Sequence, residues 1–349
     1  MAGGVKTIEI VSLSAGTIGE NFVKHEVDLG VKRLKEMGLT VLFGENALKG
    51  IEFVKAHPEE RAKDLIAALT NPEVDMILCA IGGEDTYRLL PYLFGNGELE
   101  KAVKTAQAQK KIFLGYSDST MNHFMLHKVG LKTFYGQSFL SDVCELASDM
   151  LPYTKTYFSE LISTGKIAEI TPSDVWYESR TDFSVNALGT MPIAHQNTGF
   201  ELLQGEDGFA GEILGGCLDT IFDIFDNTRF SDTVDLCRKY DLFPSVDDWR
   251  GKILLLETSE EKMSCEKYEK ALNYLKNTGI FGAISGIIVG KSVDEHLWSE
   301  YKDLLKRIVP KNVPIVCNLS IGHALPRCII PFGVKARVSV NVQKIAFDW

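Results

Sequence analysis

A serine that could act as a nucleophile stands in the segment GYSDST, residues 115–120. The apolar run 112–114 precedes it, and apolar residues recur at helical spacing over 121–129, so the pattern predicts a strand, a sharp turn and a helix. At such a turn, backbone N–H groups and the helix dipole favour a developing negative charge. Ser117 is therefore a candidate nucleophile for acyl transfer. Alternatively, Ser117 and its polar neighbours only cap the helix by satisfying its first N–H groups.

A glutamate and a histidine could complete an acyl-transfer set with this serine. Glu257 follows an apolar strand predicted at 252–256, and His323 lies on a Gly-Pro loop after a strand predicted at 314–317. A serine hydroxyl is a poor nucleophile until an imidazole takes its proton, and the imidazole needs a carboxylate to fix its tautomer. These residue types therefore predict a triad with Ser117. Taken singly, Glu257 could be a helix-capping acid and His323 an ordinary loop histidine.

A pair of glycines could bring backbone N–H groups to the same place. The strand predicted at 74–80 leads into Gly82-Gly83, where the backbone can bend and approach a ligand closely. Because ligands of open α/β sheets bind at the carboxyl ends of the strands, we expect this turn and the Ser117 turn to lie side by side. The N–H groups of Gly83 and Asp118 are then candidates for stabilising a tetrahedral oxyanion. The alternative is an ordinary tight turn.

The elements that must position these residues alternate between strand and helix. At 349 residues, the chain exceeds the usual size of one hydrophobic core, and the alternation weakens over 145–200, which contains three prolines. We therefore expect an α/β fold with an N-terminal domain at 1–150 that carries the nucleophile, and a C-terminal α/β domain at 151–349 that carries Glu257 and His323. The second half also holds a Gly-rich turn predicted at 215–216. First-half strands are predicted at 8–12, 39–43, 74–80, 112–114 and 132–135.

Composition restricts the class of protein. A formal net charge of −10 disfavours a large surface for a nucleic-acid polymer, although a small anionic ligand stays possible. The apolar start of the chain is too short for a signal peptide, and the longest apolar run, 280–290, is too short for a membrane span. Seven scattered cysteines are typical of reduced, buried thiols. We therefore expect a cytoplasmic protein without a membrane partner.

Several motifs are set aside. The segment GIIVGKS at 286–292 has three residues between its glycines, where a phosphate-binding P-loop requires four. GYSDS lacks the second glycine of the G-x-S-x-G elbow of α/β-hydrolases. His123 and His127 are four residues apart but lack an obvious third metal ligand. We therefore expect no metal and no cofactor.

Four segments stand in a fixed order along the chain: IGGEDTYRLLPYL at 81–93, GYSDST at 115–120, LLLETSEE at 254–261 and the Gly322-His323 loop. In order and spacing, they resemble the serine peptidases that comprise the LD-carboxypeptidases and the microcin C self-immunity peptidases. The resemblance covers nearly the whole chain. It implies an N-terminal Rossmann-like parallel-sheet domain, a C-terminal α/β domain, a Ser-Glu-His triad and a homodimer.

Within that family, the immunity branch hydrolyses the amide that joins a peptide or amino acid to a nucleotide. The 81–93 segment looks closer to this branch, which uses a tryptophan after the first domain to stack on the nucleobase; Trp176 is the candidate, with Gly82 as a further substrate contact. A partly buried aromatic anchor is the alternative for Trp176. Glu84-Asp85 and Cys217 depart from the asparagines that are common in this branch, which leaves the substrate open rather than the chemistry.

The leading hypothesis is a serine peptidase or amidase that hydrolyses the amide of a peptidyl- or aminoacyl-nucleotide. Removal of the terminal D-alanine from a murein tetrapeptide, the reaction of the carboxypeptidase branch, is the alternative within the family. An alternative of a different class is a small-molecule binding protein in which the same cleft holds a ligand without catalysis.

Overall fold

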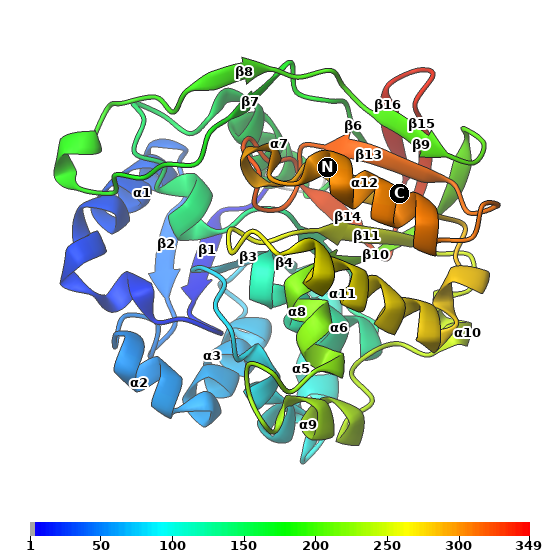
Figure 1. Cartoon of the computed structure of the whole chain (residues 1–349). Coiled ribbons are helices and arrows are strands. Elements are labelled where there is room, and N and C mark those ends of the chain that lie inside the picture. The colour runs from blue at the N-terminus through cyan, green and yellow to red at the C-terminus, as the bar shows by residue number, and fades with distance from the viewer. Residues whose placement is uncertain (1–3) are drawn as a thin grey trace.

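A computed structural model describes residues 4–349, and Figure 1 gives their arrangement. The first sheet has the strand order β14-β5-β4-β3-β1-β2. All neighbouring pairs from β5 to β2 are parallel, as expected for strands joined by crossover helices. The predicted N-terminal parallel-sheet fold is therefore confirmed. The strands are β1 (Thr7–Val11), β2 (Thr40–Phe43), β3 (Met76–Cys79), β4 (Ile112–Gly115), β5 (Thr133–Tyr135) and β14 (Ile330–Phe332).

Helices connect the strands of this sheet. Their apolar residues recur at helical spacing, as expected for helices that bury one face. In α3, for example, Ala62, Leu65 and Leu69 are all buried. The Ser117 turn begins a short 3₁₀ helix, η4 (Ser117–Ser119), that continues directly into α6. The α-helices of this half are α1 (Lys24–Glu36), α2 (Ile51–Ala56), α3 (Pro58–Thr70), α4 (Leu90–Phe94), α5 (Glu98–Ala108), α6 (Thr120–Lys128) and α7 (Pro152–Thr164).

The second sheet has eight strands in the order β6-β16-β15-β10-β11-β12-β13-β9. Its four central strands, β10 to β13, are parallel, and antiparallel strands flank them on both sides. All five residues of β11 are buried, as its continuous apolar run predicts. The strands are β6 (Glu169–Ile170), β9 (Glu201–Gln204), β10 (Phe209–Cys217), β11 (Ile253–Glu257), β12 (Gly286–Gly290), β13 (Ile315–Leu319), β15 (Lys335–Ser339) and β16 (Lys344–Asp348).

The remaining strands and helices come from the second half of the chain. A separate two-stranded hairpin, β7–β8, runs along one edge of the molecule (Figure 1). The hairpin strands are β7 (Val175–Tyr177) and β8 (Ala194–Gln196), and the helices are α8 (Leu218–Phe225), α9 (Thr233–Lys239), α10 (Val246–Trp249), α11 (Cys265–Thr278) and α12 (Trp298–Ile308).

The prediction of a turn at Gly215-Gly216 is wrong. Both glycines are paired residues of β10, where they lie opposite Leu255 and Leu256 of β11. Their φ angles are 137° and 140°, and a Cβ on Gly215 would lie 2.1 Å from the carbonyl oxygen of Leu255. Glycine is therefore required here by the close approach of two strands rather than by a turn.

One strand crosses between the two halves of the chain. β14, from residues 330–332, pairs with β5 at the edge of the first sheet, so the C-terminal half completes the N-terminal sheet. The boundary between residues 150 and 151 remains a prediction. Among the described residues, we find no helix with the length and apolarity needed to cross a membrane.

Candidate active site

Ser117 lies two residues after the end of β4, in a backbone conformation that is unusual for a residue with a side chain. Its φ angle is +64°, in the left-handed region that costs a non-glycine residue about 1–3 kcal/mol. Two hydrogen bonds hold it there: the Ser117 N–H donates to the Tyr135 hydroxyl (3.3 Å), and the Thr120 hydroxyl donates to the Ser117 carbonyl (2.7 Å). The turn therefore holds the hydroxyl of Ser117 in a fixed place at the end of the sheet.

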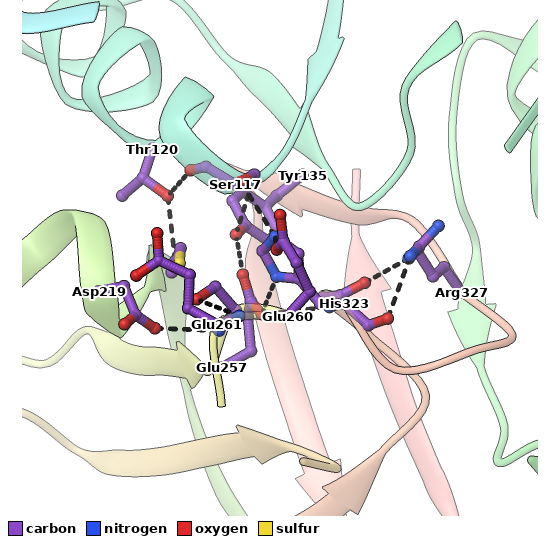
Figure 2. Close-up of polar contacts among 12 residues, drawn as sticks. Ser117, Thr120, Tyr135, Asp219, Glu257, Glu260, Glu261, His323 and Arg327 are labelled. Carbon is purple, nitrogen blue, oxygen red and sulfur yellow. Dashed lines mark hydrogen bonds and ion pairs between the residues drawn. The ribbon is translucent and has the colours of Figure 1, made fainter. Parts of the chain in front are cut away.

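The structure brings Ser117, His323 and Glu257 into one hydrogen-bonded chain (Figure 2). Nε2 of His323 lies 2.9 Å from Ser117 Oγ, and Nδ1 lies 2.8 Å from Glu257 Oε2. The His323 backbone N–H also donates to Glu257 Oε2 at 3.2 Å. Since both His323 and Glu257 are buried, this arrangement fixes the Nδ1–H tautomer and directs the Nε2 lone pair at the serine.

Each member of the buried pair shifts the pKa of the other. Burial by itself raises the pKa of Glu257, but His323 and the hydrogen bonds to the carboxylate hold it below its ordinary value. Burial by itself lowers the pKa of His323, but the Glu257 carboxylate raises it above its ordinary value. The site therefore stabilises an imidazolium, the form that His323 takes after it accepts a proton from a serine.

Tyr135 is a site residue that the sequence reasoning missed. Its hydroxyl donates to Glu257 Oε1 at 2.6 Å while it accepts the Ser117 N–H. Tyr135 ends β5, and its register partner on β4 is Gly115, two residues before Ser117. A tyrosine at the carboxyl end of the neighbouring parallel strand was the available signal.

The predicted oxyanion residues lie at the same pocket as Ser117. Gly83 and Asp118 both line it, and a Cβ on Gly82 would lie only 2.6 Å from Ser117 Oγ. The Asp118 carboxylate accepts hydrogen bonds from the Ser14 hydroxyl (2.5 Å) and from the Thr86 N–H and hydroxyl (2.9 and 2.7 Å). This carboxylate therefore ties the Ser117 turn to the loop that carries the two glycines.

The pocket at Ser117 is small and its wall is acidic. Its volume is about 30 Å³, roughly the room of one water molecule. Figure 2 shows Asp219, Glu260 and Glu261 around Ser117, Glu257 and His323. The lining residues are Gly83, Ser117, Asp118, Cys217, Asp219, Thr220, Asp223, Arg229, Ser259, Glu260 and Glu261.

Trp176 does not line that pocket. It lies on β7, next to the loop that carries the histidine, because the Tyr177 N–H donates to the Leu325 carbonyl at 3.0 Å. Its ring stacks on His195 with a centroid distance of 4.4 Å, and Lys291 Nζ lies 5.3 Å from the ring centroid. The indole is half-buried and held in place by neighbours of its own.

Two groups of potential metal ligands have other partners. The ring nitrogens of His123 contact Thr133 Oγ1 (2.8 Å) and the Gly115 carbonyl (3.0 Å), and burial lowers the pKa of this histidine to about 4. Cys217, Glu257 and His323 offer donor atoms within 4.8 Å of one another. Because Glu257 and His323 are hydrogen-bonded to each other and, through His323, to Ser117, we interpret this second group as part of the serine site.

The chain matches a known family over both of its halves. The family profile of the LD-carboxypeptidase N-terminal domain matches residues 8–136, and that of the LD-carboxypeptidase C-terminal domain matches residues 210–338. The chain is similar to the putative carboxypeptidase YocD of Bacillus subtilis, with 28% identity over 87% of this chain and 85% of that protein. It is also similar to the microcin C7 self-immunity protein MccF of Escherichia coli, with 24% identity over 93% and 88%.

Solved structures extend the comparison. An MccF-like protein from Streptococcus pneumoniae, solved in complex with AMP, is 60% identical, with a TM-score of 0.97 over 99% of both chains. An MccF-like protein from Bacillus anthracis is 24% identical, with a TM-score of 0.80 over 99% of this chain and 97% of that one; at this identity, the likeness shows the fold alone.

Proposed function

The chain belongs to the LD-carboxypeptidase family of serine peptidases, and on this premise we propose that it is an amide hydrolase whose nucleophile is Ser117. The observation that carries the proposal is the hydrogen-bonded chain from Ser117 through His323 to Glu257. In this assignment, His323 is the general base and Glu257 orients its ring. Gly83 and Asp118 donate backbone N–H groups to the oxyanion.

The proposed reaction proceeds in two steps, acylation of Ser117 and hydrolysis of the acyl-serine. The Ser117 hydroxyl proton passes to His323 Nε2 while Oγ forms a bond to the carbonyl carbon; the C–N bond then breaks as Nε2–H protonates the leaving nitrogen. In the second step, Nε2 takes a proton from water as the water oxygen attacks the acyl-serine; the bond between the carbonyl carbon and Oγ then breaks, Nε2–H returns the proton to Ser117 Oγ, and the acid is released. Each oxyanion donor typically contributes about 10²–10³ in kcat, so the position of the Gly83 N–H relative to Ser117 matters for the rate.

We propose an aminoacyl- or peptidyl-nucleotide as the substrate. The support is the S. pneumoniae relative, which is 60% identical over almost the whole chain and was solved with AMP. Trp176 would stack on the nucleobase, a contact that contributes about 1–3 kcal/mol per base. Its contact with His195 holds the indole in one orientation before the ligand arrives.

A second candidate reaction is cleavage of a murein tetrapeptide. It is favoured by similarity to a probable murein peptide carboxypeptidase of Bacillus subtilis, at 26% identity over 90% of this chain. Hydrolysis of alanyl sulfamoyl adenosine and of an LD-tetrapeptide, measured side by side with wild type and Ser117→Ala, separates the two reactions. A protein that only binds ligands would cleave neither compound and would fail to react with a serine-directed fluorophosphonate.

We also propose that the protein acts as a homodimer in the cytoplasm. All seven cysteines are free thiols, which favours a reducing compartment. The segment that joins β7 to β8 exposes several large apolar side chains, and its Phe183 carbonyl contacts His25 of α1. A second copy of the chain is the proposed occupant of this apolar patch, which comprises Phe22, Phe183, Val185, Leu188, Met191 and Ile193.

A further inference from the structure

Glu260 lines the Ser117 pocket and contacts the proposed catalytic histidine. Its Oε2 atom lies 3.1 Å from Nε2 of His323, the same nitrogen that lies 2.9 Å from Ser117 Oγ. Figure 2 shows Glu260 beside both residues. The Glu260 side chain is 72% exposed, and among residues 4–349, His323 is its one recorded ion-pair partner. A substrate can therefore displace this carboxylate by replacing a single contact.

The contact competes with activation of the serine. Neutral His323, with its proton on Nδ1 toward Glu257, has a lone pair on Nε2 that accepts the Ser117 hydroxyl. An Nε2–H, by contrast, donates to Glu260. The carboxylates of Glu257 and Glu260 favour the protonated ring, and Arg327 opposes them. The other neighbours are Tyr116, whose ring centroid lies 5.0 Å from that of the imidazole, Tyr135, which bonds Glu257, and Cys217. While Glu260 remains on Nε2, the protonated and inactive ring is favoured.

The rest of the pocket wall also favours a cation over an anion. Asp223 and Glu261 share the single guanidinium of Arg229, which also binds Glu84. Burial raises the pKa of Asp223 to about 7, and the neighbouring carboxylates add to the shift although Arg229 and Lys267 oppose it. An ammonium group would therefore gain more from this wall than a carboxylate or phosphate would.

We propose that Glu260 recognises a free α-ammonium group on the acyl residue of the substrate, and that this recognition releases His323 to activate Ser117. The inference rests on the proposed function. In an aminoacyl amide, the α-nitrogen lies two bonds, roughly 2.5 Å, from the scissile carbonyl carbon. That carbon must approach Ser117 Oγ to about 3–3.5 Å. Glu260 Oε2 lies 3.1 Å from His323 Nε2, and this nitrogen lies 2.9 Å from the same Oγ, so the carboxylate is close enough to meet the α-nitrogen.

The proposal distinguishes between two substrate classes. An aminoacyl-nucleotide carries a charged α-ammonium that can replace His323 as the partner of Glu260. A peptidyl-nucleotide carries a neutral amide at the same position, and a neutral amide N–H is a weaker partner for a carboxylate than an ammonium is. The enzyme should therefore prefer the aminoacyl compound.

The test uses alanyl sulfamoyl adenosine and its N-acetyl derivative as a matched pair. We expect wild type to hydrolyse the free amine with a kcat/KM at least about tenfold higher, the size of one charge-assisted contact. Glu260→Gln should remove this preference by slowing only the free amine, and Glu260→Asp should restore part of it. Glu300→Gln, an exposed acid on α12, is the control and should behave as wild type.

A pH profile supplies a readout that a purely structural role would not change. With the N-acetyl compound, Glu260→Gln should shift the acid limb of kcat/KM to lower pH, because one negative charge beside Nε2 is gone. Equal rates for the two compounds in wild type, or an equal loss on both in Glu260→Gln, would overturn the inference. If wild type cleaves neither compound but Ser117 still reacts with fluorophosphonate, the proposed substrate is wrong and the inference falls with it. Without labelling, the proposed nucleophile is wrong as well.

Discussion

The Tyr135 hydroxyl donates to Oε1 of Glu257, while Oε2 of the same carboxylate receives His323. Both carboxylate oxygens are therefore occupied, and the carboxylate cannot rotate away from the imidazole without losing a buried hydrogen bond. Since the same hydroxyl accepts the N–H of Ser117, one phenol connects the acid and the nucleophile of the proposed triad.

Tyr135→Phe should therefore lower kcat while the protein still folds. The substitution leaves Glu257 Oε1 and the Ser117 N–H without their partner, and leaving a buried polar group unsatisfied costs about 1–3 kcal/mol. We expect kcat to fall by roughly 10–100-fold, with a modest decrease in Tm. Steady-state kinetics and thermal unfolding check this. An unchanged kcat would show that Glu257 does not need the phenol.

The pH dependence follows from the buried pair. His323 must be neutral at Nε2 to take the serine proton, and the Glu257 carboxylate raises its pKa above the ordinary value. kcat/KM should therefore rise with pH through a midpoint above about 6.5, the value for an unperturbed histidine. In Glu257→Gln, the charge that favours the imidazolium is gone, so the midpoint should move to lower pH as the rate falls. A midpoint that stays in place would contradict this coupling.

Gly82→Ala tests how close the glycine loop lies to the nucleophile. A Cβ at this position would lie 2.6 Å from Ser117 Oγ, so either the serine or the loop must move. Because a displacement of about 1 Å can cost roughly 10²-fold in rate, we expect at least that loss in the rate of fluorophosphonate labelling. Gly282→Ala is the matched control, since a Cβ there meets no atom within 4 Å.

The clustering of Ser117, Glu257 and His323 could be predicted because each lies at or shortly after the end of a buried strand. Ser117 and Glu257 come directly after or at the end of runs that are apolar throughout, and parallel strands bring their carboxyl ends to one edge. Tyr135 could not be separated from core residues in the same way, because an aromatic side chain in a strand is usually there for packing. Glu260 is an exposed acid beside the triad glutamate, and no pattern along the chain indicates that it turns back toward His323.

The fold was predictable where the periodicity is strong and not where contacts are distant. The five parallel strands of the first sheet stand out as apolar runs, but β14 joins them from residues 330–332 through a pairing with β5 that no local signal shows. The sequence predicts a turn at Gly215-Gly216 because a glycine pair has the same signature in a turn and at a close contact between strands. The two-residue strand β6 is too short to show any periodicity.

Trp176→Ala tests the proposed nucleobase contact. If the indole stacks on the base, its loss should weaken AMP binding by about 1–3 kcal/mol, or roughly 5–150-fold in Kd, and should leave the fluorophosphonate reaction of Ser117 unchanged. Calorimetric titration with AMP measures the first effect. Trp349→Ala, which removes an indole that stacks on Phe134 at the end of the chain, is the control. Equal affinities of Trp176→Ala and wild type for AMP would show that Trp176 does not stack on the base.

A charge placed in the apolar patch that is proposed as the dimer interface should dissociate the dimer. Ile193 is 62% exposed on the β7–β8 segment, and a charge at the centre of an interface is strongly unfavourable unless it finds a partner. Ile193→Asp should therefore convert a dimer into monomers in sedimentation velocity at micromolar concentration. Val342→Asp is the matched control, because Val342 is equally apolar, is 66% exposed and lies outside the patch. If wild type sediments as a monomer, or if both variants stay dimeric, this patch is not the interface with a second copy of the chain. A stable interface buries about 1,200–2,000 Å² in total, so the patch must extend beyond these side chains, and a loss confined to Ile193→Asp would locate its centre.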